Sequence, residues 1–349
     1  MTPYTDLSLT AQTAYAQLFD AALSSEPMRS IADLPGSFAA KTVKGHKYWY
    51  FQYTEPSGQL RQIFVGPDND AVAALIQRKS SGSSRQALSA LAQSAGALGC
   101  AVILPRHFHV IRRLSEYGFF HAGGVLVGTH AFLGFGNMLG VAWGDVSRTQ
   151  DIDFAHAGKN LSLALPANIE VHIPAAIESL GMGFLPVASL SSKAGATYLN
   201  PREPDFRLDF LTTLHRGGEK PYTHPQLQVT LQPLKFMEFS LENVQQAALF
   251  CAEGAVIVNV PHPARYALHK LLVYGERTGT FAAKGNKDIM QAGCLLTLMK
   301  ERRPWEVEAA WKDLISRGPG WVTRAKRGLR GVDKAFPALK LAGWLKLPV

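Results

Sequence analysis

Two aspartates separated by one residue stand inside an apolar run, in the segment SRTQDIDFA at residues 147–155. Because side chains of a β-strand alternate between its two faces, Asp151 and Asp153 would project from the same side. Two carboxylates in apolar surroundings repel each other, and such a pair stays ionised chiefly when divalent cations bind it. The spacing therefore predicts a metal site, with helix-capping or ion-paired acids as the alternative interpretation.

A third candidate ligand follows in the segment RLDFL, where Asp209 has the same apolar flanks as Asp153, although Glu203 and Asp205 are near. If the two segments form neighbouring strands, three carboxylates converge. Two divalent ions about 3.5–4 Å apart can activate an attacking hydroxyl and neutralise the leaving oxygen in a phosphoryl displacement. We expect Mg²⁺, or Mn²⁺ as the alternative, and phosphoryl or nucleotidyl transfer as the chemistry.

A glycine turn precedes these acids. Gly128 and Thr129 close a predicted strand and open a predicted helix of small residues. Backbone N–H groups at a helix N-terminus bind phosphates, so this turn is a candidate phosphate site. The segment GGVLVG fits neither the P-loop nor the dinucleotide-binding fingerprint, so the prediction depends on its position before the two aspartates.

The order VGTHAF, RTQDIDF and RLDFL resembles the DNA-polymerase-β-type nucleotidyltransferase superfamily, and within it the minimal, toxin-like branch related to abortive-infection toxins. The resemblance covers about residues 100–300, and PARYALHKLL and KGNKDIMQA resemble that branch's later helices. The spacer between Thr129 and Asp151 holds 21 residues, longer than in the compact pattern, and Gly-Thr stands in place of Gly-Ser. The residues that the resemblance places at the nucleotide are Gly128, Thr129, Arg148, Thr149, Lys270, Lys287 and Asp288. The alternative interpretation is that the two lysines are surface residues and that Arg148 pairs with an acid.

The resemblance implies Mg²⁺-dependent transfer of a nucleoside monophosphate from an NTP to an acceptor, with pyrophosphate leaving. Asp151 and Asp153 would hold both metal ions, and Asp209 would bind one of them and assist deprotonation of the acceptor. RNA, tRNA included, is the expected acceptor, a protein or an antibiotic is the alternative, and a toxin-like member would have an antitoxin partner. The alternative from another class is an inactive protein of the same fold that binds nucleic acid or a partner.

Charge and aromatic patterning bear on the acceptor. The formal net charge is +9, and from Arg317 onward eight basic residues stand against one acid. Residues 44–68 alternate aromatic and polar side chains around a Pro-Ser-Gly turn, which predicts a β-hairpin. Its aromatic residues would either stack on bases or pack in a core, and the basic end would either bind RNA or form a solvated helix face.

Composition and cysteine content argue against several classes of protein. Hydrophobic residues make up 47% of the chain and charged residues 18%, which excludes general disorder. No apolar run reaches the roughly 18–20 residues of a membrane span, and the N-terminus lacks the pattern of an export signal, so we expect no membrane contact and a cytoplasmic location. Three scattered cysteines argue against a disulfide framework or a zinc site. His107 and His109 would point to different sides of a helix, which argues against a metal pair.

We expect an α+β protein in three parts. Residues 1–97 form an N-terminal accessory region with a helix over 1–35, the hairpin, and a polar helix over 69–97 with a break near RKSSGSSRQ. Residues 98–260 form the nucleotidyltransferase core, a mixed sheet with flanking helices. Residues 261–349 form a C-terminal helical bundle with a basic tail. The expected core strands are 150–155, 196–200, 206–212, 236–241 and 247–260, and the expected C-terminal helices are 263–275, 285–300, 304–316 and 320–337.

Overall fold

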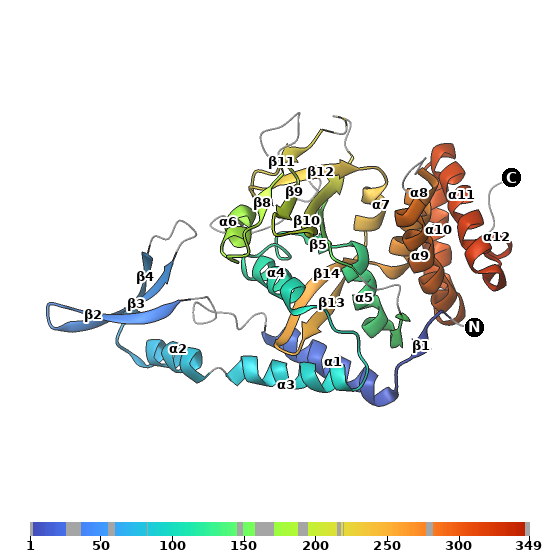
Figure 1. Cartoon of the computed structure of the whole chain (residues 1–349). Helices are drawn as coiled ribbons and strands as arrows, with labels where there is room; N and C mark the ends of the chain where they lie inside the picture. Colours follow the sequence, from blue (N-terminus) through green and yellow to red (C-terminus); the bar gives the residue numbers. More distant parts are fainter. Residues whose placement is uncertain are drawn as a thin grey trace.

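The structure is a computed structural model, which describes residues 3–25, 36–54, 60–81, 83–144, 149–157, 171–187, 195–214, 218, 220–276 and 282–345. Figure 1 shows a central body, a small sheet that projects from one end of it, and a group of helices at the other end. None of the described helices is long and apolar enough to cross a membrane.

The body is built on a mixed sheet in the order β11-β12-β10-β7-β5, as the α+β expectation requires. β10 runs parallel to both β7 and β12, and β9 pairs antiparallel with the first half of β10. The strands of this sheet are β5 (Gly124–Leu126), β7 (Ile152–His156), β8 (Leu185–Pro186), β9 (Thr197–Asn200), β10 (Glu203–Thr213), β11 (Tyr222–Thr223) and β12 (Thr230–Leu234). The expected strands near 150–155, 196–200 and 206–212 are therefore confirmed.

One face of β7 and β10 packs into the main core. Phe154 and Phe210 are fully buried and their rings stack with centroids 5.3 Å apart. Phe119 meets both rings edge-on, at 5.5 and 6.2 Å. Since these residues alternate with the aspartates along each strand, this face is apolar. On the other face the aspartates are followed by Ala155 and Leu211, which belong to a second apolar cluster with Met237 and Leu241.

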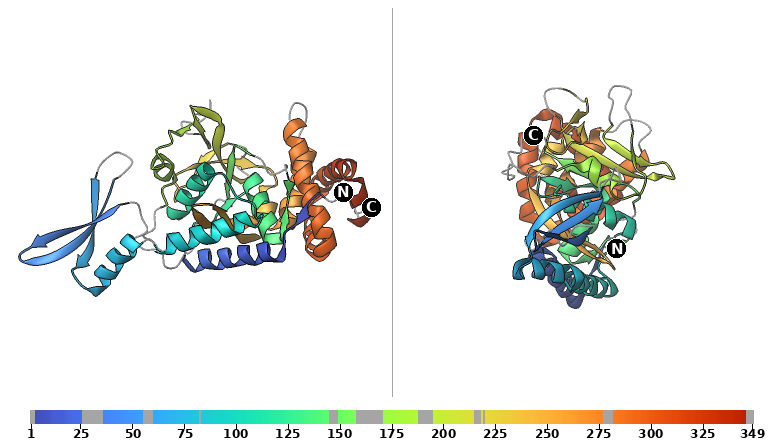
Figure 2. Two further views of the ribbon diagram at one scale, coloured as in Figure 1. Left: turned by 60° about the horizontal axis from the view of Figure 1, so that its bottom comes forward. Right: turned by 90° about the vertical axis from the view of Figure 1, so that its left-hand side faces the viewer.

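A second layer covers the body. The hairpin of β13 (Val244–Cys251) and β14 (Gly254–Pro261) contacts α4 (Pro105–Glu116) and α5 (Gly128–Leu139) on one side, and α1 (Leu9–Ser25) and α3 (Ser83–Ala97) on the other. Figure 2 shows α1 and α3 lying side by side. Three short elements complete this body, namely β1 (Thr5–Asp6) paired with β6 (Val141–Ala142), and α6 (Ile173–Glu178).

The projecting part is a three-stranded antiparallel sheet of β2 (Ser37–Val43), β3 (His46–Thr54) and β4 (Leu60–Pro67), followed by α2 (Asp70–Ser81). The expected hairpin is confirmed as β3 and β4, with β2 as an additional strand, whereas its Pro-Ser-Gly turn lies outside the described residues. The polar helix is confirmed as α2 and α3 (Ser83–Ala97), whereas the expected break falls on a position between them that lies outside the described residues and stays a prediction.

The expected C-terminal helices are confirmed as α8 (Pro263–Glu276), α9 (Ala282–Arg302), α10 (Pro304–Ser316) and α11 (Pro319–Ala335), and α12 (Leu341–Trp344) follows. Glycine permits the close crossing of α8 and α11. A Cβ at Gly328 would lie 2.5 Å from the carbonyl oxygen of Leu271, and one at Gly275 would lie 2.2 Å from that of Arg324. Any larger residue would push these helices apart.

The strand expected at 236–241 is wrong, because Met237–Leu241 forms the single helical turn α7. Its apolar residues alternate in the sequence as they would in a strand. Phe236 takes a left-handed conformation at φ 66°, which turns the chain and buries Met237, Phe239 and Leu241. The turn contacts β10 and α8, so tertiary packing decides its conformation.

Two pairs of histidines are buried in the body. His107 Nδ1 lies 3.0 Å from His130 Nε2, and the rings of His156 and His224 have centroids 4.6 Å apart. Burial lowers the pKa of His107 to about 4 and that of His130 to about 3, with neighbouring positive charge as the smaller cause. Burial likewise lowers the pKa of His224 to about 4. These imidazoles are therefore neutral at pH 7.

This arrangement predicts an acid-sensitive fold. The unfolded chain binds protons at histidines near pH 6.5 and the native state does so only near pH 4, so their contribution to stability is complete above pH 6.5 and is lost as the pH falls toward 4. In urea denaturation at several pH values, His130→Gln should reduce the slope of unfolding free energy against pH by up to about 1.4 kcal/mol per pH unit. The exposed His46→Gln is the matched control, and identical slopes for His130→Gln and wild type would contradict the prediction.

Candidate active site

Three carboxylates converge on the open face of β7 and β10. Asp209 lies directly opposite Asp153 in the parallel register, and Asp151 precedes β7 on the same face. One oxygen of each carboxylate lies within 4.8 Å of the others, and all three side chains are partly buried. Asp205 is exposed and outside this group, and Glu203 is ion-paired with Arg106. The structure therefore brings together the three acids that the strand pattern predicts.

Neighbouring hydroxyls and a guanidinium orient these acids. Thr197 Oγ1 donates a hydrogen bond to Asp209 Oδ1 at 2.6 Å, and Thr149 Oγ1 donates one to Asp151 Oδ1. Arg207 lies 3.8 Å from Asp151 Oδ2 and 3.7 Å from Asp209 Oδ2. Burial alone would raise the pKa of Asp151, but the Thr149 hydrogen bond and the charges of Lys287 and Arg207 hold the pKa below its usual value.

Gly128 lies so close to Asp153 that no side chain would fit between them. Its φ is +62°, and a Cβ there would lie 2.0 Å from Asp153 Oδ2, so conformation and space both require glycine. The preceding residue donates its N–H to the Asp153 carbonyl oxygen at 2.9 Å. α5 begins at Gly128, so the N-terminus of this helix lies beside the carboxylates.

A buried polar network connects this glycine turn to the C-terminal helices. Tyr266 Oη lies 2.9 Å from the Gly128 carbonyl oxygen and 2.8 Å from Gln291 Oε1. Gln291 is fully buried, and its Nε2 donates to Thr129 Oγ1 at 3.3 Å. Thr129 is thus held by α9, and the turn is fixed by residues more than a hundred positions away in sequence.

The two predicted lysines lie on these helices. Lys270 Nζ is 2.7 Å from Asp288 Oδ1, and although burial favours its neutral form, Tyr266 and Asp288 raise its pKa above the usual value. Burial is the main reason that the pKa of Lys287 is lowered, although its charge is attracted to Asp151 and other acids. Lys270 therefore forms an ion pair with Asp288, whereas Lys287 interacts electrostatically with Asp151.

Sequence patterns could have found some residues that they missed. Arg207 stands two positions before Asp209 on a strand, so alternation places both on one face. Tyr266 stands four positions before Lys270, and Gln291 four after Lys287, which is the spacing of one helix face. Thr197 carries no such signal, since its contact depends on the β9–β10 register.

Three further residues that the sequence singles out are Arg148, His107 and His109. Arg148 lies outside the described residues, so its role stays a prediction. His107 contacts His130, whereas His109 Nε2 lies 2.7 Å from Glu253 Oε2, which confirms that the two point to different sides of α4.

The donor set fits a hard divalent cation. Carboxylate oxygens are the ligands that Mg²⁺ and Mn²⁺ prefer, and the group contains neither sulfur nor imidazole. Among the described residues, Arg207 supplies positive charge between two of these acids.

Comparison with known proteins gives a family match and a structural similarity. No curated protein sequence matches the chain. A crystal structure of an antigenic nucleotidyltransferase-like protein from Paracoccidioides brasiliensis is similar over 63% of this chain and 92% of that chain, at 14% identity and a TM-score of 0.29. Residues 106–316, more than half of the chain, match the model of a family described as nucleotidyltransferase. The match extends from α4 to the end of α10, and the chain belongs to this nucleotidyltransferase family.

Proposed function

We propose that the protein transfers a nucleoside monophosphate from an NTP to an RNA acceptor with the aid of divalent cations. The observation that carries the proposal is the convergence of Asp151, Asp153 and Asp209 beside the N-terminus of α5. Family membership supports nucleotidyl transfer in general, whereas the metal, the nucleotide and the acceptor are inferred from the residues.

Each group in the site has a role in this reaction. The backbone at Gly128 and Thr129 binds phosphate oxygens, and Lys287 supplies positive charge beside them. An oxygen of the acceptor hydroxyl forms a bond to the α-phosphorus, the bond to the β-phosphate oxygen breaks, and pyrophosphate leaves. Asp209, oriented by Thr197, helps to take the hydroxyl proton.

Asp151, Asp153 and Asp209 would hold Mg²⁺ or Mn²⁺. When bound, the cations supply charge neutralisation at the phosphates and activation of the attacking hydroxyl. Because Arg207 lies close to the same oxygens, its guanidinium must move aside or turn toward the substrate when cations bind. Lys270 supports the site indirectly, since its ion pair with Asp288 fixes α8 against α9.

RNA is proposed as the acceptor because the chain carries a net charge of +9. The toxin-like role, with an antitoxin partner, is carried over from the resemblance in the acid and glycine motifs. A protein or an antibiotic as acceptor, and an inactive protein that only binds nucleic acid or a partner, are the competing functions, and one experiment separates them.

Transfer of α-³²P-labelled NTPs into RNA, protein and small-molecule fractions of a bacterial lysate identifies both enzyme and acceptor. With Mg²⁺ or Mn²⁺ present, we expect label in RNA. We expect Asp153→Asn and Asp209→Asn each to reduce it at least about 100-fold, since even the loss of a residue that only hydrogen-bonds to a metal ligand costs about 10–100-fold. Asp205→Asn, an exposed acid on the same strand, should retain activity. Label in the protein or small-molecule fraction would show that the acceptor is not RNA. No label together with no NTP binding would support the inactive alternative.

The close contact at Gly128 gives a second prediction. Gly128→Ala should reduce nucleotidyl transfer by more than about tenfold, because its Cβ would displace the Asp153 carboxylate. Gly181→Ala is the matched control, since Gly181 has a similar φ of +65° but nothing within 4 Å of the added Cβ. Both variants carry the same backbone strain, so equal activities would show that the Asp153 contact is unimportant.

A further inference from the structure

The projecting sheet of β2, β3 and β4 presents aromatic side chains on one face. In its antiparallel register Lys41 lies opposite Tyr48, and Tyr50 lies opposite Phe64. Residues directly opposite each other share a face, and Tyr48 and Tyr50 share it through strand alternation. We call Lys41, Tyr48, Tyr50 and Phe64 the aromatic face.

The rings of this face form one continuous group. The centroids of Tyr50 and Phe64 are 5.5 Å apart, and those of Tyr48 and Phe64 are 6.0 Å apart. Lys41 Nζ lies 4.8 Å from the centroid of the Tyr50 ring. Phe64 is 56% exposed, an unusual position for a phenylalanine in a folded domain. The group is thus a partly open apolar surface with a cation beside it, in which Phe64 is exposed and Tyr48 and Tyr50 are half-buried.

The opposite face already supplies the core of this sheet. Phe51 is fully buried, and its ring lies edge-on to Phe38 at 5.3 Å. α2 contacts β4, and Val72 is buried close to Gly66. Phe51 is thus the buried centre of this opposite face, on which Trp49 is half-buried and Ile63 exposed, whereas the aromatic face carries the exposed Phe64.

Charge indicates the kind of partner. From Ser37 to Pro67 the sequence holds four basic residues against one acid, Glu55. Lys41 and Lys44 are exposed, whereas Lys47 is ion-paired with Asp68 at 3.3 Å. Solvent-exposed rings among cations are the combination that binds single-stranded nucleic acid, because bases stack on the rings and phosphates follow the cations.

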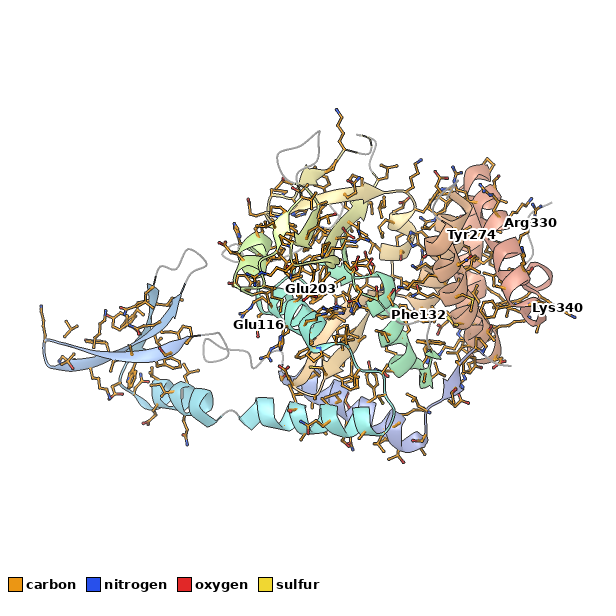
Figure 3. The ribbon with its side chains drawn as sticks, in the orientation of Figure 1. Glu116, Phe132, Glu203, Tyr274, Arg330 and Lys340 are labelled. Atoms are coloured by element: carbon orange, nitrogen blue, oxygen red, sulfur yellow. The ribbon has the colours of Figure 1, made fainter. Side chains whose placement is uncertain are left out.

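The basic C-terminal end is a weaker candidate for this role. Arg317 is ion-paired with Glu242 and Asp313, and Arg324 with Glu276. Figure 3 shows the labelled Arg330 and Lys340 at the end of the molecule opposite the projecting sheet. Part of the positive charge in that region is thus neutralised by ion pairs, and no exposed ring cluster accompanies it among the described C-terminal residues.

We propose that the aromatic face binds an unpaired segment of the acceptor RNA and so recruits it to the enzyme. The choice of RNA rests on the proposed function, but the binding itself does not depend on catalysis. Because stacking needs splayed bases, single strands are favoured over duplexes. The sheet projects from the body (Figure 1), so it can hold a part of the RNA distant from the reacting end.

Fluorescence anisotropy with a labelled single-stranded RNA dodecamer, in EDTA and without NTP, tests the proposal. Tyr50→Ala and Phe64→Ala should each raise Kd at least about fivefold, since base stacking contributes about 1–3 kcal/mol per base. Lys41→Gln should weaken binding and reduce its salt dependence. Ile63→Ala, which removes an exposed residue from the opposite face, should leave Kd within about twofold and is the matched control.

Two further measurements separate the possible failures. Asp151→Asn/Asp153→Asn should bind the RNA as wild type does, so loss of nucleotidyl transfer alone leaves this inference intact. Sedimentation of wild type and Phe64→Ala shows whether the face joins two copies of the chain. Absence of RNA binding by the wild type, equal binding by all variants, tighter binding of a duplex of the same sequence, or self-association that Phe64→Ala abolishes would each overturn the proposal.

Discussion

Repulsion among three carboxylates is the constraint on which the site depends. Unit charges 4.8 Å apart repel by about 3 kcal/mol at an effective dielectric constant of 20, and three such pairs meet here. The strands that carry them are held together from the other face by the stacked Phe154 and Phe210. Arg207 and Lys287 lie near the acids, and their positive charges help to hold the pKa of Asp151 below its usual value. The core thus provides the packing that keeps mutually repelling charges in place.

The second feature of the structure is the dependence of the glycine turn on distant helices. Gly128 must stay close to Asp153, and Tyr266 and Gln291 hold this turn from α8 and α9. The family match, residues 106–316, includes these helices. The proposed phosphate site is thus shared between the sheet and the C-terminal helices, and changes in their packing would reach the nucleotide.

Sequence patterns predicted the parts of this protein that depend on local periodicity. The alternation around Asp153 and Asp209 predicted two strands with acids on one face, and helical spacing predicted α8 to α11 closely. Contacts set by register or tertiary packing could not be predicted in this way. Thr197 reaches Asp209 only through the pairing of β9 with β10, and Met237–Leu241 turns into a helix because its neighbours bury it. The aromatic hairpin divides between core and surface, which alternation implies but composition alone does not settle.

Counting bound Mn²⁺ by electron paramagnetic resonance, with a non-hydrolysable NTP analogue present, tests the central claim most directly. The account predicts two Mn²⁺ per chain in the wild type, and loss of both the cations and tight analogue binding in Asp153→Asn. Tight analogue binding that persists in EDTA and in Asp153→Asn would contradict it, because the three carboxylates would then have no part in holding the nucleotide.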